Sequence, residues 1–156
     1  MALATTLQQY LAERKVAYDV TTHDPTTTAS RSAQQSHVPG DWLAKAVVVK
    51  DDERFVMAVL PASHHLRLGE LSRLLDRQVG LATEEEASGL FGDCDFGAIP
   101  ALGAAYGLEM VVDDSLASQP EIYFEGGDHR SLVHVSAEGF HTLTEGARHG
   151  SFSSHD

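Results

Sequence analysis

Cysteine is nearly absent from this sequence, because Cys94 is the only one among its 156 residues. A single cysteine cannot form an intrachain disulfide, so disulfide-stapled secreted folds are excluded and a reducing compartment is favoured. Long apolar runs are missing too. The longest, near residues 55–60, are far shorter than the roughly 20 residues that span a bilayer. Residues 1–10 lack the basic segment and apolar core of a signal peptide. We therefore predict a cytoplasmic protein with no membrane partner.

Basic residues are scarce. Eleven lysines and arginines face 23 aspartates and glutamates, which gives a formal net charge of −12. Proteins that bind duplex nucleic acid usually present a basic surface, because neutralising phosphates supplies much of the affinity. The composition therefore excludes DNA and limits any RNA contact to a short part, such as a single-stranded end. On charge alone, a role with small molecules and without RNA fits equally well.

The strongest local cluster of positive charge is formed by Arg67, Arg73 and Arg77. Arg73 and Arg77 lie one helical turn apart within a leucine-rich segment, so they share a face if that segment is a helix. The cluster is a candidate contact for an RNA end. The alternative is an ordinary solvated helix face.

Several sequence motifs with known chemistry are missing. The chain has nine histidines, but it contains no HExxH or CxxC pattern, and we expect no metal. His129 and His134 are five residues apart, so in a continuous strand they face opposite ways. Without GxxxxGK[ST], GxGxxG or GxSxG, we expect no nucleotide or dinucleotide cofactor and no serine triad. Cys94 is expected to be an inert, partly buried thiol.

Periodicity predicts a mixture of helices and short strands. We expect helices at residues 3–15, 29–37, 66–77, 83–90 and 136–143, the fourth starting with a Thr83–Glu86 capping box. We expect strands at residues 16–22, 46–50, 55–60, 108–112, 122–125 and 132–135, with a hairpin at 51–54. Residues 92–107 hold four glycines and Pro100 and are expected to form an ordered loop.

This order of elements predicts an α+β fold, in which a mixed, largely antiparallel sheet is flanked by helices. The length suits one domain. We assign the domain to residues 1–143 and expect residues 144–156, which are rich in Gly, Ser and His, to form a flexible tail.

Four segments together resemble the YbaK/ProRS-associated family of aminoacyl-tRNA editing proteins. The sequence Leu-Ala-Lys-Ala-Val-Val-Val at 43–49 resembles its lysine-bearing strand, and 59–62 its next strand end. Residues 97–103, Gly-Ala-Ile-Pro-Ala-Leu-Gly, are similar to its Gly/Pro substrate loop. Residues 126–129 and 132–140 are similar to its C-terminal signature. Each motif alone is weak, but their order and spacing across residues 5–143 are specific.

The resemblance implies a trans-acting aminoacyl-tRNA deacylase that hydrolyses mischarged tRNA, often a small amino acid on proline tRNA. It implies two partners, the 3′ end of aminoacyl-tRNA and prolyl-tRNA synthetase. It places a cleft between the lysine strand and the Gly/Pro loop. The residues that it implicates in catalysis are Lys45 and Gly97. Those that it implicates in substrate binding are Ala98, Ile99, Pro100, Gly103 and His129.

One position departs from the family pattern. The family usually has glycine four residues before the loop proline, whereas Phe96 stands there in this sequence and the nearest glycine, Gly97, is three before. A bulky side chain or a one-residue shortening at this place leaves the fold unaffected but could change which amino acid fits.

The residues themselves fit ester cleavage. That reaction needs donors aimed at a developing oxyanion and a positioned nucleophile, and glycine-rich backbone from Gly97 to Gly103 can offer N–H groups at close range. Lys45 begins an apolar strand and could hold a phosphate or ribose hydroxyl; alternatively it points to solvent. His129 could be an acid–base group or an ordinary turn histidine.

Two classes of function follow. One is the editing hydrolase, which supplies the second sieve that a synthetase pocket needs against near-isosteric amino acids. The other is a catalytically silent binding module of the same fold, which recognises an aminoacyl group, a nucleotide or a protein partner.

Overall fold

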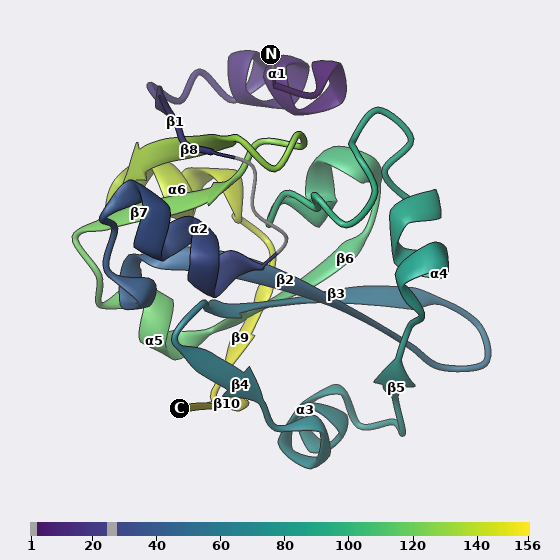
Figure 1. The fold of residues 1–156 in the computed structure, drawn as a ribbon. Coiled ribbons are helices and arrows are strands. Elements are labelled where there is room, and N and C mark those ends of the chain that lie inside the picture. The colour runs from purple at the N-terminus through teal and green to yellow at the C-terminus, as the bar shows by residue number, and fades with distance from the viewer. Residues whose placement is uncertain (1–2, 25–27) are drawn as a thin grey trace.

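The computed structural model of the chain describes residues 3–24 and 28–156, and Figure 1 shows how their helices and strands are arranged. The α-helices are α1 (Thr5–Glu13), α2 (Ala29–Ser36), α3 (Leu68–Leu75), α4 (Glu84–Gly89), α5 (Asp114–Ala117) and α6 (Ala137–Leu143). Two short 3₁₀-helices are η1 (Gly40–Trp42) and η2 (Gly103–Tyr106). The strands are β1 (Asp19–Thr22), β2 (Leu43–Lys50), β3 (Phe55–Pro61), β4 (His64–Leu66), β5 (Gly80–Leu81), β6 (Glu109–Asp113), β7 (Glu121–Glu125), β8 (Ser131–Ser136), β9 (Arg148–Gly150) and β10 (Ser153–His155).

The main sheet has the strand order β1-β8-β7-β2-β3-β6-β9, with β5 paired to β2 beside this path. The pairs β1–β8, β8–β7, β2–β3 and β2–β5 are antiparallel, whereas β7–β2, β3–β6 and β6–β9 are parallel. Strands β4 and β10 form a separate antiparallel pair. The predicted fold class, a mixed and largely antiparallel sheet flanked by helices, is therefore confirmed.

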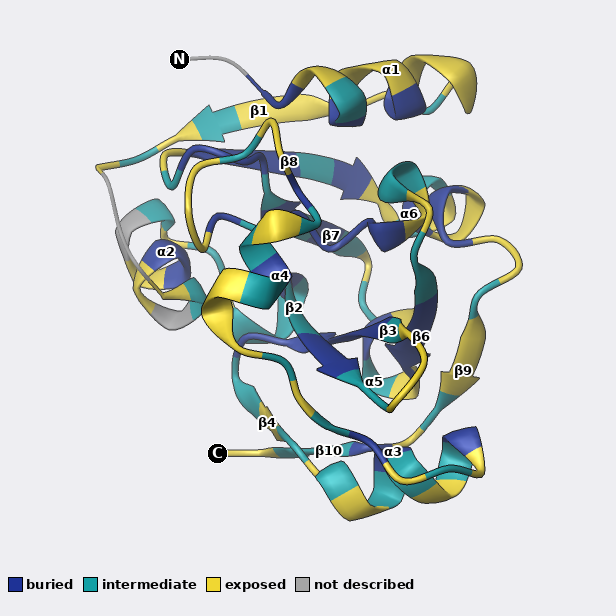
Figure 2. Cartoon of the chain, turned by 90° about the vertical axis from the view of Figure 1, so that its right-hand side faces the viewer, coloured by how far each residue is buried: buried dark blue, intermediate teal, exposed yellow. Residues whose placement is uncertain are grey.

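Strand β3 is buried on both faces, which explains its continuous apolar sequence. Met57 and Val59 face the larger core, which includes Leu7 and Leu11 of α1. The alternate residues of β3 face a second core, in which α3 packs with Phe152. Figure 2 shows this burial in dark blue along β3, with exposed yellow residues on the outer side of α1. The sheet is thus covered on both sides in its centre.

Local signals act as the sequence predicts at several element ends. Thr83 accepts a hydrogen bond from the Glu86 N–H, and the Glu86 side chain accepts one from the Thr83 N–H, so the predicted capping box starts α4. The β2–β3 hairpin closes where Asp51 Oδ1 accepts the N–H groups of residues 53 and 54 at 2.8 and 2.9 Å.

The last residues of the chain are part of the fold, which corrects the prediction of a flexible tail at residues 144–156. Strand β9 pairs with β6, and β10 pairs with β4. Phe152 is fully buried, and its N–H donates to Asp113 Oδ2 at 3.0 Å. Composition alone suggested a tail because one aromatic among polar residues gives little periodicity, yet that aromatic anchors both strands. The domain therefore extends beyond residue 143.

Other differences are small. Leu66, counted as the start of a helix by its spacing, ends β4 instead, and η2 occupies part of the expected loop. Within the described ranges, no helix has both the length and the apolar composition needed to cross a bilayer.

Candidate functional site

A pocket of about 210 Å³ lies where β2 and β7 separate. The two strands pair only at Leu43 and Ala44 of β2, and beyond that point their backbones diverge. The gap is closed on one side by the start of α2 and on the other by the loop after α4. The pocket is lined by Thr28, Ala29, Ser32, Leu43, Ala44, Lys45, Ala46, Gly97, Ile99, Glu125, His129 and Leu132.

Strand β2 has an open edge at this pocket. The Leu43 carbonyl accepts the Ala62 N–H at 2.7 Å, so the odd-numbered residues of β2 direct their backbone groups toward β3. The even-numbered residues face the other way, where Ala44 pairs with β7 and the Val48 carbonyl accepts an N–H from the chain after β5. Among the described residues, no strand pairs with Ala46 on this side. Its N–H and carbonyl therefore face the pocket.

Lys45 is held at the pocket by backbone carbonyls. Its Nζ donates to the His64 carbonyl at 2.5 Å and lies 3.5 Å from the Ala62 carbonyl. An ammonium group has three N–H donors and no acceptor. Two of them are directed at these carbonyls, which leaves the third for a ligand. The alternative of a strand-end lysine pointing freely into solvent does not describe this half-buried side chain.

The charge of Lys45 is set by opposing effects. Burial lowers the pKa of Lys45 below its usual value, because a partly desolvated ammonium is less stable. The Asp156 carboxylate acts in the opposite direction and raises that pKa. The protonation of Lys45 therefore depends on the balance between its burial and the nearby Asp156 carboxylate.

The loop that carries Gly97 is tied down by its own hydrogen bonds. Gly97 has a φ of 78°, in the left-handed region that favours glycine. Its N–H donates to Ser88 Oγ at 3.0 Å, and the Ala98 N–H donates to the Asp95 carbonyl at 2.9 Å. The Gly97 N–H is therefore already engaged within the loop, so the prediction that the backbone from Gly97 to Gly103 offers N–H groups to a substrate depends on its other residues.

Ile99 is the better donor in this loop. It lines the pocket, and its backbone N–H makes no hydrogen bond to any described residue. The next residue, Pro100, has no N–H and fixes its own φ, which stiffens the loop at this point.

Three of the predicted substrate-binding residues do not reach the pocket. Ala98, Pro100 and Gly103 are buried and do not line it. A Cβ on Gly103 would come within 3.1 Å of Leu108 and 3.2 Å of Met57, so this glycine permits close packing. Lys45, Gly97, Ile99 and His129 are the predicted site residues that the structure brings together.

His129 sits in a tightly held turn between β7 and β8. One carboxylate oxygen of Glu125 accepts three successive N–H groups, those of residues 127–129, at 2.8, 3.1 and 3.1 Å. Asp128 is buried and accepts N–H groups from residues 130 and 131. His129 itself has a φ of 61°, which is uncommon for a non-glycine residue.

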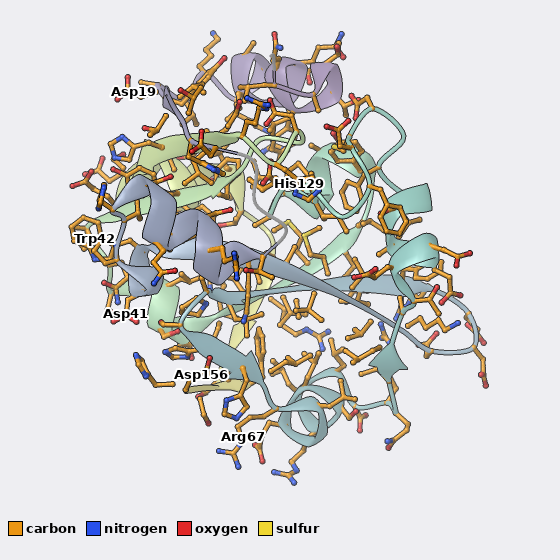
Figure 3. All side chains as sticks on the ribbon, viewed as in Figure 1. Asp19, Asp41, Trp42, Arg67, His129 and Asp156 are labelled. Atoms are coloured by element: carbon orange, nitrogen blue, oxygen red, sulfur yellow. The ribbon has the colours of Figure 1, made fainter. Side chains whose placement is uncertain are left out.

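The imidazole of His129 bridges this turn to the loop. Its Nε2 lies 2.6 Å from the Phe96 carbonyl, and because a carbonyl only accepts, Nε2 carries the proton. In a neutral ring, Nδ1 is then the only nitrogen that can accept a proton. His129 therefore positions the backbone of Phe96 and Gly97, and Figure 3 shows it between the loop and the sheet.

Comparison with known proteins assigns the family. The family model described as the aminoacyl-tRNA editing domain matches residues 23–143. This chain is an aminoacyl-tRNA editing domain. A search of curated proteins found no match to it. The resemblance that the sequence motifs indicated is thus confirmed at the level of the family.

Solved structures with the same fold cover almost the whole editing domain. One, provisionally described as a trans-editing enzyme for prolyl-tRNA synthetase, has a TM-score of 0.83 and 25% identity over 97% of this chain and 96% of its own. The hypothetical protein APE2540 gives 0.82 and 24%, over 96% and 99%. A protein from Marinobacter aquaeolei VT8, with signal transduction as its suggested role, gives 0.76 and 22% over 97% of this chain but 31% of its own.

Sequence reasoning missed part of the editing-domain pocket. Glu125 was not singled out, although its place directly before Gly126 and Gly127 is a signal, because a carboxylate commonly collects N–H groups in such a turn. Three residues at the start of α2 line the pocket but carry no chemical motif, namely the N-cap Thr28 and the helical residues Ala29 and Ser32. They reach the site only through the way α2 packs on β2.

The other candidates from the sequence lie elsewhere in the editing domain. Arg77 pairs with Asp51 at 2.6 Å, and Arg73 pairs with Glu70 at 2.8 Å. Two of the three arginines in this cluster are thus engaged in local ion pairs, Arg67 donates to Ser154 Oγ instead, and none of the three lines the pocket. Burial raises the pKa of Cys94 to about 11, so the thiol is a poor nucleophile. No metal-binding group of His, Cys, Asp or Glu occurs within the described part of the chain.

Proposed function

We propose that this editing domain is a trans-acting deacylase that hydrolyses the ester of a mischarged aminoacyl-tRNA. Its family and its likeness to a protein described as a trans-editing enzyme support this reaction class. The observation that carries the proposal is the partly buried Lys45 ammonium beside the unpaired edge of β2. A cation and free backbone donors converge there on a small pocket.

The chemistry that these groups support is acyl-ester cleavage. A nucleophilic hydroxyl, from water or from the substrate, attacks the carbonyl carbon, and the bond to the ribose oxygen then breaks. With water as the final acceptor of the acyl group, the products are a free amino acid and a tRNA with its terminal hydroxyl restored. The Ala46 and Ile99 N–H groups are the candidate donors to the developing oxyanion, and preorganised donors of this kind usually lower the barrier most.

Lys45 has a different role in this proposal. Its remaining N–H holds a phosphate or ribose oxygen of the terminal nucleotide and so places the ester against the open strand edge. Correct placement of the reacting groups can supply a large part of the rate. Lys45 and Gly97 remain our proposed catalytic residues, with Gly97 acting through the shape of the loop rather than through its N–H.

The size of the pocket favours a small amino acid. Its volume of about 210 Å³ is below the roughly 300–1,000 Å³ of sites that enclose drug-sized ligands. Such a pocket holds an aminoacyl group but leaves the nucleotide at the rim. We therefore propose a small amino acid on proline tRNA as the substrate, and prolyl-tRNA synthetase as the enzyme whose errors are corrected in the cytoplasm.

The contact with RNA is limited to the end of the molecule in this proposal. Arg31 on α2 and Arg130 after His129 are exposed and flank the pocket elements. Neither has an ion-pair partner among the residues described, in contrast to Arg73 and Arg77. These two arginines are our candidates for phosphate contacts, and they replace the cluster that the sequence suggested.

A binding module is the second candidate, because His129 Nε2 is already committed to the Phe96 carbonyl and Cys94 is not activated. Deacylation of a tRNA panel separates the two functions. Proline tRNA charged with alanine, cysteine or proline is incubated with the protein, and release of the labelled amino acid is compared with spontaneous hydrolysis.

The deacylase proposal predicts accelerated release of one mischarged amino acid while correctly charged tRNA is spared. No acceleration for any member, together with measurable binding of the intact aminoacyl-tRNA, would favour the binding module and contradict the deacylase.

A further inference from the structure

The carbonyl that holds Lys45 belongs to β4, and β4 is itself held by the end of the chain. Lys45 Nζ donates to the His64 carbonyl, and His64 is the first residue of β4. Strand β10 pairs with β4 in antiparallel register, with Ser154 opposite His65. The Asp156 N–H donates to the Ser63 carbonyl at 2.9 Å, which extends this pairing by one more bond.

Side chains reinforce the same contact. His64 Nδ1 lies 2.8 Å from Ser153 Oγ, and Arg67 donates to Ser154 Oγ at 3.1 Å. Asp156 Oδ1 lies 2.9 Å from His65 Nδ1. Figure 3 places Asp156 and Arg67 on the same side of the molecule, near β4. The segment from Ser153 to Asp156 therefore fastens β4 along its length.

The segment also supplies charge near the site. The charged and titratable groups on the elements around Lys45 are His64 and His65 of β4, Asp41 of η1, His155 and Asp156 at the end of the chain, and Glu125 and His129 across the pocket. Glu125 is occupied by three backbone N–H groups, and Asp41 accepts a hydrogen bond from Ser63. Asp156 is the carboxylate that acts on Lys45, and it raises the pKa of that lysine.

We propose that residues 153–156 are a positioning element of the active site, which fixes β4 as the anchor of Lys45 and places the Asp156 carboxylate near its ammonium. This segment lies beyond residues 23–143, the part that the family model matches. The proposal that Lys45 serves deacylation rests on the proposed function, whereas the electrostatic coupling between Asp156 and Lys45 is independent of that function.

Lysine side-chain NMR tests the coupling directly, because the chain has only three lysines, Lys15, Lys45 and Lys50. With isotope-labelled lysine, the titration midpoint of each ammonium is followed around the usual lysine pKa of about 10.4. Two variants are compared with the wild type: Asp156→Asn, and a chain that ends at Phe152 and so keeps the buried anchor. Asp114→Asn, an exposed aspartate in the first turn of α5, is the matched control.

We expect the Lys45 midpoint to move to lower pH in Asp156→Asn, because removing the carboxylate leaves burial unopposed, and to move in the shortened chain as well, where β4 is also released. Lys15 and Lys50 should not move, and Asp114→Asn should leave all three unchanged. An unchanged Lys45 midpoint in Asp156→Asn and in the shortened chain overturns the inference.

Deacylation adds a second readout. In Asp156→Asn, the alkaline limb of the pH–rate profile should move to lower pH, and the shortened chain should lose about ten- to hundredfold in kcat/KM through misplacement of Lys45. The two proposals can fail separately. A shifted Lys45 midpoint in a protein that deacylates nothing contradicts only the proposed function, whereas an active enzyme with an unshifted midpoint contradicts only this inference.

Discussion

At the scale of residues, the polar groups of the pocket are held mainly by backbone. Lys45 donates to the His64 carbonyl, His129 lies against the Phe96 carbonyl, and Glu125 collects three N–H groups. Carbonyls and N–H groups are placed by the strands and turns that carry them. Sequence patterns could predict Lys45 and His129, but not these backbone partners, which come from β4 and from a loop distant in sequence.

His129 offers a test of this backbone control. Its φ of 61° costs a residue with a Cβ roughly 1–2 kcal/mol, whereas glycine adopts it freely. We therefore expect His129→Gly to be more stable than His129→Ala by about 1 kcal/mol, although both lose the contact with Phe96. Urea denaturation measures the difference. Equal stability of the two variants would contradict the left-handed turn, and both should deacylate more slowly than the wild type.

At the scale of elements, short strands at the end of the chain complete the fold. Strands β9 and β10 are three residues each and flank Phe152, which packs against α3 and β3. Their sequence has no alternation, so periodicity could not predict them. By contrast, the β2–β3 hairpin and the α4 capping box were predictable because their signals are local.

Phe152 should therefore be a major anchor. Phe152→Ala removes a fully buried aromatic ring, and we expect it to lower the free energy of unfolding by about 3–5 kcal/mol. Phe96→Ala is the control, since Phe96 is 57% exposed and surface substitutions usually change stability by less than about 0.5 kcal/mol. Trp42, the only tryptophan, reports unfolding by fluorescence. A small effect of Phe152→Ala would show that the end of the chain is not anchored.

The Asp113 carboxylate, which accepts the Phe152 N–H, makes the stability contributed by this anchor depend on pH. Burial alone would raise its pKa, but hydrogen bonds from Ser115 and from the Phe152 N–H bring the pKa below its usual value. Such a carboxylate contributes stability above the unfolded value of about 3.9, and this contribution is lost as the pH falls through the folded value. Asp113→Asn should thus cost about 1–3 kcal/mol near neutrality and much less once the pH has fallen below the lowered pKa of the folded state.

The pH dependence of unfolding checks this expectation, with Asp114→Asn as the neighbouring exposed control. A cost of Asp113→Asn that stays constant from acid to neutral pH would contradict the assigned role of its carboxylate.

At the scale of the whole molecule, the acidic net charge and the small pocket both favour a limited contact with RNA. A net charge of −12 opposes broad contact with RNA, and a pocket of about 210 Å³ needs contact only with the charged end of a tRNA. The predicted fold class is confirmed, whereas the limited contact with RNA stays a prediction. The sequence could not predict which arginines lack an ion-pair partner among the described residues, because ion pairing of Arg73 and Arg77 depends on partners brought near by folding.

The salt dependence of RNA binding tests whether the contact is limited to the end of the tRNA. For single strands, the logarithm of the binding constant falls with log salt by about 0.7 per phosphate contacted. We expect the plot of log binding constant against log salt concentration to have a slope no steeper than about −2. In Arg31→Ala and in Arg130→Ala, this slope should become shallower by about 0.7. Arg73→Ala should leave the slope unchanged. If Arg73→Ala reduces the slope and the other two variants do not, the RNA contact lies on α3 instead.

The most direct test of the central claim compares two lysines of the same strand. Lys45 lies in the pocket, whereas Lys50 pairs with Glu86 at the other end of β2. Single-turnover deacylation of the best mischarged substrate is measured for the wild type, Lys45→Ala and Lys50→Ala. We predict a loss of about a hundredfold or more for Lys45→Ala, comparable to removal of an oxyanion donor, and little change for Lys50→Ala. Equal rates for Lys45→Ala and the wild type would contradict the account.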